Sequence, residues 1–143
     1  MARSFTFPLP YLREDGPLCQ VILKPSQATA KKLKEEKRKV PSMRVLALID
    51  TGASSTAISG KVINTLKLVP HGTVKIYTSN KNAEIRNEYD IALAFNRDVR
   101  LPVLRVFAAN LRHRRIDCLI GRDVLQHGLF IYNGSENQVT LSF

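Results

Sequence analysis

The chain has 143 residues, which is enough for one ordinary domain with a buried core but too few for two domains. We therefore expect residues 1–143 to form a single domain. Hydrophobic residues make up 44% of the sequence, yet no apolar run approaches the roughly 18 to 20 residues that cross a bilayer, which excludes a helical membrane protein. The net charge of +10 favours acidic partners and does not indicate the fold.

The N-terminal segment lacks the apolar core of a secretory signal because Pro8 interrupts it, and we therefore expect a cytoplasmic protein. Cys19 and Cys118 lack CxxC spacing and lie in apolar, strand-like runs, which predicts buried, reduced thiols. The three histidines do not have the spacing of a zinc pair. The sequence thus predicts neither a metal nor a cofactor.

The first half of the chain contains two expected strands with a basic helix between them. Residues 18–23 form an apolar, strand-like run, and Ser26 then offers a helix start. The basic helical insertion near residues 26–40 has only a narrow apolar stripe and should lie on the surface. The next strand, residues 44–49, leads directly into Asp50.

Farther along, short apolar runs alternate with turn residues. Residues 74–77 and 85–95 are predicted strands joined by the turn-rich residues 78–82, which together indicate a β-hairpin that projects from the body. The other expected elements are short helices at 61–66 and 121–125, strands at 101–108 and 118–120, and a hairpin of residues 129–132 and 138–143. This pattern is typical of a barrel or sandwich and not of alternating β-α units.

One motif stands at the end of the strand at 44–49. Asp50, Thr51, Gly52 and Ala53 place a carboxylate at the edge of the core, followed by a small, flexible turn. Because Asp and Thr favour turns and Gly accepts positive φ, the same pattern is also an ordinary strand exit. The motif alone does not decide between these readings.

A second motif lies about 70 residues later, where two apolar strand residues precede Gly121 and a short helix. With both motifs, the chain resembles the retropepsin-like family of aspartic peptidases, whose Asp-Thr/Ser-Gly-Ala/Ser loop is followed by a strand ending in Gly and a helix. The resemblance covers residues 18–143, apart from the insertion at 26–41. It implies a mainly all-β, retropepsin-like acid protease barrel with one short helix in its C-terminal half and a flap hairpin.

The resemblance also implies a mechanism. Two adjacent carboxylates share a proton and activate a water that attacks the peptide bond, so neither a metal nor a covalent intermediate is needed. The chain holds one Asp-Thr/Ser-Gly, so a homodimer with Asp50 from each subunit is expected. In the family, the residue matching Thr51 hydrogen-bonds across the dimer axis, and Gly52 leaves the backbone open to a peptide or protein substrate.

Substrate contacts are expected from Ala53 and from the flap, where the candidates are Tyr77, Thr78, Ser79 and Asn80. The flap tip is polar and has no glycine, unlike retroviral flaps. Relatives with serine at the Ala53 position have one more donor near the carboxylates, so we expect a working pH nearer neutral here.

Two further expectations concern Arg122 and the chain ends. In retroviral proteases an arginine at this place pairs with an acid where this chain has Ser54, so the partner of Arg122 stays open, with Asp123 or an acid of the second subunit as candidates. The alternating residues 5–9 and 139–143 could build an intersubunit sheet, as terminal strands do in retroviral relatives.

Two other functions remain open. One is a catalytically inactive retropepsin-fold module for dimerisation or peptide binding. The other is a nucleic-acid-binding protein, suggested by the basic residues 31–39 and 112–115. Nucleic acid is not an expected partner, because single-strand binders place aromatics among their charges and this sequence has none between Tyr11 and Tyr77.

Overall fold

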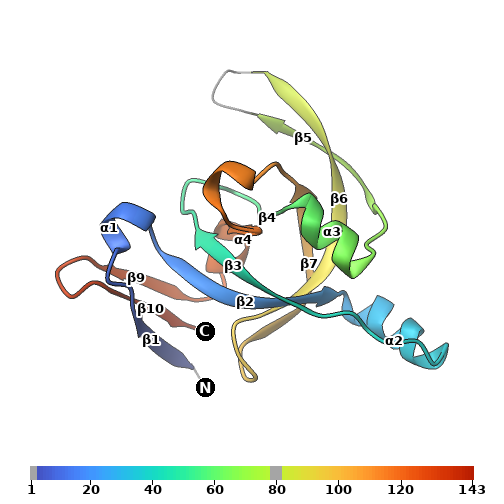
Figure 1. Cartoon of the computed structure of the whole chain (residues 1–143), viewed down its shortest axis with the longest axis horizontal. Helices are drawn as coiled ribbons and strands as arrows, with labels where there is room; N and C mark the ends of the chain where they lie inside the picture. The colour runs from blue at the N-terminus through green and yellow to red at the C-terminus, as the bar shows by residue number, and fades with distance from the viewer. Residues whose placement is uncertain (1–2, 78–81) are drawn as a thin grey trace.

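The computed structural model describes residues 3–77 and 82–143 (Figure 1). Over these residues the strands form a seven-stranded sheet in the order β2-β3-β8-β4-β7-β6-β5 and a three-stranded sheet in the order β1-β10-β9. The strands are β1 (Ser4–Pro8), β2 (Leu18–Pro25), β3 (Met43–Ile49), β4 (Ala57–Ile58), β5 (Gly72–Tyr77), β6 (Ala83–Ala94), β7 (Arg100–Ala108), β8 (Cys118–Ile120), β9 (Leu129–Asn133) and β10 (Gln138–Ser142). The helices are α1 (Leu12–Asp15), α2 (Gln27–Glu35), α3 (Gly60–Leu66), the 3-10 helix η1 (Arg112–Arg114) and α4 (Arg122–Leu125).

The larger sheet closes on itself, because β2 pairs with β6 as well as with β3. The ring runs through β2, β3, β8, β4, β7 and β6, while β5 extends it outside the ring as the partner of β6. The predicted mainly β barrel is therefore confirmed. Among the helices of the described residues, none is long and apolar enough to span a membrane.

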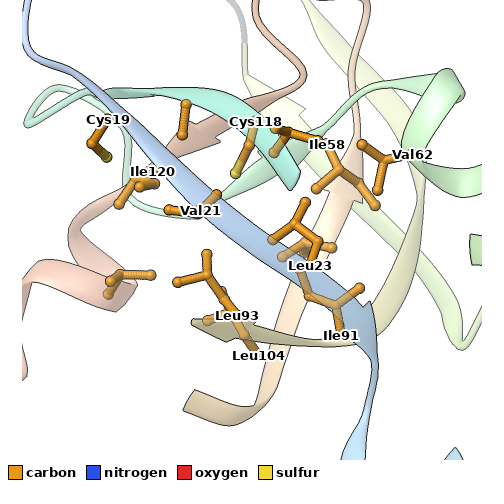
Figure 2. Packing of buried hydrophobic residues seen from close by; sticks show 14 of the residues in the cluster. Cys19, Val21, Leu23, Ile58, Val62, Ile91, Leu93, Leu104, Cys118 and Ile120 are labelled. Carbon is orange, nitrogen blue, oxygen red and sulfur yellow. The ribbon is translucent and has the colours of Figure 1, made fainter. Parts of the chain in front are cut away.

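The core lies inside this ring and follows from the period-2 alternation of its strands. Cys19, Val21 and Leu23 of β2 point inward, as do Cys118 and Ile120 of β8 (Figure 2). The cysteines are free and buried, as predicted. Burial raises the pKa of the Cys19 thiol from 9.0 to about 12, and it also raises the pKa of Cys118.

The basic insertion contains the predicted helix. Ser26 caps α2 by accepting a hydrogen bond from the backbone N of Thr29 at 3.4 Å, and no residue of α2 is buried. The helix ends at Glu35, earlier than the predicted end near residue 40, because Lys37 adopts a left-handed φ of 56° that α-helical geometry does not allow. Figure 1 shows α2 projecting from the end of β2 at the rim of the barrel.

The predicted hairpin is formed by β5 and β6, with register from Gly72 opposite Glu88 to Tyr77 opposite Ala83. It arches over one end of the barrel in Figure 1. Thr78, Ser79 and Asn80, which were predicted to contact substrate, lie outside the described residues.

The terminal strands pair with each other within the chain. β1 runs antiparallel to β10 in a register that extends from Ser4 opposite Ser142 to Pro8 opposite Gln138. Their alternation turns Phe5 and Phe7 toward the core, where Phe5 contacts Phe95 at a ring-centroid distance of 5.9 Å. The two terminal segments that could build an intersubunit sheet therefore pair with each other within one subunit.

Candidate active site

Asp50 stands where β3 leaves the barrel. The alternation of β3 buries Val45, Ala47 and Ile49, and Ile49 is the last residue of the strand. The backbone N of Asp50 still donates to the carbonyl O of Ile120 at 2.8 Å, so the parallel pairing with β8 continues to Asp50 itself. A half-buried carboxylate is thereby fixed at the rim of a rigid sheet.

The turn after Asp50 orients its carboxylate. The backbone N of Gly52 donates to Asp50 Oδ1 at 2.8 Å, and the backbone N of Ala53 donates to the carbonyl O of Asp50 at 3.2 Å. A Cβ at position 52 would lie 3.1 Å from Oδ1, so a larger residue would push the carboxylate aside. The predicted residues Asp50, Thr51, Gly52 and Ala53 thus form one compact turn.

The segment from β8 into α4 crosses this turn and holds it. A Cβ at Gly121 would lie 2.7 Å from the carbonyl carbon of Ser55, so the crossing has room only for glycine. The backbone N atoms of Arg122 and Asp123 donate to the carbonyl O atoms of Ala53 and Ser54, at 2.9 and 3.2 Å. The two motifs recognised in the sequence are therefore in direct contact.

A second connection was missed from the sequence. Buried Thr56 donates from its Oγ1 to Asp123 Oδ1 at 2.7 Å and from its backbone N to Asp123 Oδ2 at 2.9 Å. The same Oγ1 accepts the backbone N of Gly121 at 3.1 Å. The one sequence signal for this contact is the position of Thr56, a polar residue directly before the apolar pair Ala57 and Ile58.

Arg122 reaches the Asp50 turn directly. Its Nη1 donates to the carbonyl O of Thr51 at 2.8 Å, while the carboxylate of Asp123 is taken by Thr56. The partner of Arg122 within the chain is thus a backbone carbonyl, and Asp123 does not fill that role. A guanidinium placed there stabilises the Thr51–Gly52 peptide, whose N–H donates to Asp50 Oδ1.

Beside this turn lies a hollow of about 350 Å³. It lies between the hairpin, β7 and the end of α4, and its lining includes Ser55, Val74, Ile76, Val103 and Gln126. Tyr77 is 75% exposed on β5 and is not among the described residues that line this hollow.

The comparisons with known proteins agree with this geometry. The family description "Aspartyl protease" matches residues 26–124, more than half of the chain, including both Asp50 and Gly121. The chain belongs to this aspartyl protease family. A crystal structure of a retropepsin-like aspartic protease from Rickettsia conorii matches with a TM-score of 0.57 and 11% identity, over 100% of this chain and 93% of that chain.

This structural likeness shows that the fold is retropepsin-like. The family and the fold predicted from the sequence are confirmed. No curated protein sequence matches the chain.

Proposed function

We propose that residues 1–143 form a single cytoplasmic peptidase domain that works as a homodimeric aspartic endopeptidase. The observation that carries this proposal is the Asp50 carboxylate, held at the end of β3 by the Gly52 N–H in a chain of the aspartyl protease family. The substrate is a peptide or protein, and no cofactor takes part.

The reaction needs a base and an acid at the same place. Asp50 Oδ1 accepts the Gly52 N–H, which fixes the orientation of the carboxylate that binds the attacking water. The charged carboxylate removes a proton from this water as it attacks the scissile carbonyl. The protonated one donates to the carbonyl oxygen, and a proton then passes to the departing amine.

A second subunit is required because this chain offers one suitable carboxylate. The sequence holds a single Asp-Thr/Ser-Gly. Asp123, although close in the chain to Gly121, accepts hydrogen bonds on both oxygens, from Thr56 and from the backbone N of Val124. Two-fold symmetry would bring Asp50 and the exposed Thr51 against their copies.

The test is cleavage of a diverse peptide library from pH 4 to 8 by the wild type, by Asp50→Asn and by Asp15→Asn. Asp15 is an exposed acid on α1, so its substitution is a matched control. We expect Asp50→Asn to abolish cleavage and Asp15→Asn to retain it, with an optimum nearer neutral than pH 3. Cleavage that survives in Asp50→Asn would refute the assignment of Asp50.

Mixing the subunits tests the shared site. With one wild-type chain to three Asp50→Asn chains and free exchange, only about a quarter of wild-type chains meet a wild-type partner, so activity per wild-type chain falls about fourfold. An activity per wild-type chain that does not change on mixing would show that each chain is catalytically complete alone.

A further inference from the structure

A second, larger hollow lies between α2 and the segment that joins α3 to β5, with a volume of about 1220 Å³. We call it the insertion groove. One wall is α2 with the chain that returns from it, residues 38–42, and the other wall is residues 66–71. Its lining residues that matter here are Lys32, Leu33, Glu36, Arg38, Lys39, Val40, Lys67, Leu68, Val69 and Asp90.

The charges of the insertion groove are unbalanced. The two acids that line it already have cationic partners: Glu36 lies 3.4 Å from Arg38, and Asp90 lies 3.0 Å from Arg105. Lys32, Lys39 and Lys67 face the same hollow, and none of them has an ion pair among the described residues. Three uncompensated ammonium groups in one concave site attract a negatively charged occupant.

The rest of the lining indicates which kind of anion fits. Leu33, Val40 and Leu68 add apolar surface to both walls, and Val69 is 81% exposed. No Phe, Tyr or Trp lies among the described lining residues, so the groove has no platform for stacking bases. Apolar walls with separate cations suit an extended peptide that carries both acidic and aliphatic side chains.

We propose that the insertion groove is a docking site for an acidic segment of the protein substrate, remote from the scissile bond. This inference rests on the proposed peptidase function. It assigns a role to the basic insertion, which the catalytic residues do not explain.

The fold sets the distance between the two sites. Ser42 lines the groove, β3 follows it, and Asp50 comes directly after β3. Eight residues of extended strand span about 26 Å. A substrate needs at least about eight residues to cover that distance. The acidic segment therefore lies at least about eight residues from the cleaved bond.

Binding can be measured without catalysis. A fluorescent peptide of alternating Glu and Leu is titrated, by anisotropy, into the Asp50→Asn protein with or without a pair of charge reversals. Lys32→Glu with Lys39→Glu alters the groove, whereas Lys31→Glu with Lys34→Glu makes the same change of net charge on α2 outside the groove lining. We expect about a tenfold loss of affinity for the first pair and less than about twofold for the second.

Equal losses for the two pairs would overturn the proposal, because they would show attraction to net charge alone. A single-stranded oligonucleotide serves as the competing ligand. If the oligonucleotide binds more tightly than the peptide, and if Lys32→Glu with Lys39→Glu weakens its binding, the groove is a nucleic-acid site and the proposal is wrong.

Cleavage separates this inference from the proposed function. A substrate with an acidic segment ten residues from the scissile bond should show a lower KM than one with the segment three residues away, at similar kcat. The Lys32→Glu, Lys39→Glu variant should remove the difference. Cleavage with equal KM values refutes docking alone, whereas selective peptide binding without any cleavage refutes the peptidase function and leaves a peptide-binding groove.

Discussion

Thr56→Val is the sharpest test of how the Asp50 turn is held. The substitution keeps the shape of a fully buried side chain and removes only the hydroxyl. Two hydrogen bonds disappear, one to Asp123 Oδ1 at 2.7 Å and one from the backbone N of Gly121 at 3.1 Å. The bond from the backbone N of residue 56 to Asp123 Oδ2 remains available.

The cost follows from these contacts. A hydrogen bond to a charged group contributes about 1.5 to 3 kcal/mol, and a buried N–H left without a partner costs about 1 to 3 kcal/mol. Allowing for partial relaxation, we expect Thr56→Val to lower the free energy of unfolding by about 3 to 5 kcal/mol. For a chain of this length that corresponds to a fall in Tm of about 10 °C or more.

The assay is urea and thermal unfolding, with Thr140→Val as the matched control. Thr140 also makes a side-chain hydrogen bond, with Thr6 Oγ1 at 2.7 Å, but its partner is a neutral hydroxyl and the bond is exposed to solvent in the three-stranded sheet. Loss of this hydrogen bond should lower the free energy of unfolding by about 1 kcal/mol or less. If Thr56→Val is no more destabilising than Thr140→Val, Thr56 does not hold the turn as we describe.

Three further outcomes follow from the same contacts. Gly121→Ala should destabilise the protein by about 1 to 3 kcal/mol or prevent folding, whereas Gly60→Ala, where an added Cβ meets nothing within 4 Å, should be neutral in chemical denaturation. Arg122→Ala should reduce kcat while changing the free energy of unfolding by about 1 kcal/mol or less, because its donor to Thr51 O is exposed. Cys19 should resist alkylation in the native protein, because its thiol is buried. Its pKa rises from 9.0 to about 12 on folding, so the stability that the neutral thiol contributes is complete below pH 9 and is lost toward pH 12. Cys19→Ala should therefore weaken the alkaline decline of the free energy of unfolding.

Local patterns predicted most of the elements. Strand alternation, the Ser26 cap and the two glycine motifs each depend on residues close together in the chain, so the barrel, α2 and the Asp50 turn could be predicted. The end of α2 was placed too late, because Lys37 takes a left-handed conformation that has no signal in a run of good helix formers.

Long-range contacts were less accessible. The bond from Thr56 to Asp123 joins residues 67 positions apart, and a threonine before a strand has many possible partners. The pairing of β1 with β10 was equally hard to predict, because alternation shows which face of a strand points inward but not which strand lies beside it. The family resemblance identified Gly121 as part of the second motif, and only the structure shows how closely Ser55 approaches it.

The Asp50 turn is restrained on one side and open on the other, which leads to a last prediction. Backbone hydrogen bonds with residues 120–123 hold the inner side of this turn, while Thr51 and Gly52 are exposed on its other side. A half-site that is already rigid in one chain needs no refolding when two chains meet, so association should be the step that creates activity. Activity per chain should then fall on dilution, with the same midpoint as the dimer-to-monomer transition in analytical ultracentrifugation. Constant activity per chain at concentrations where the protein is monomeric would refute the shared site.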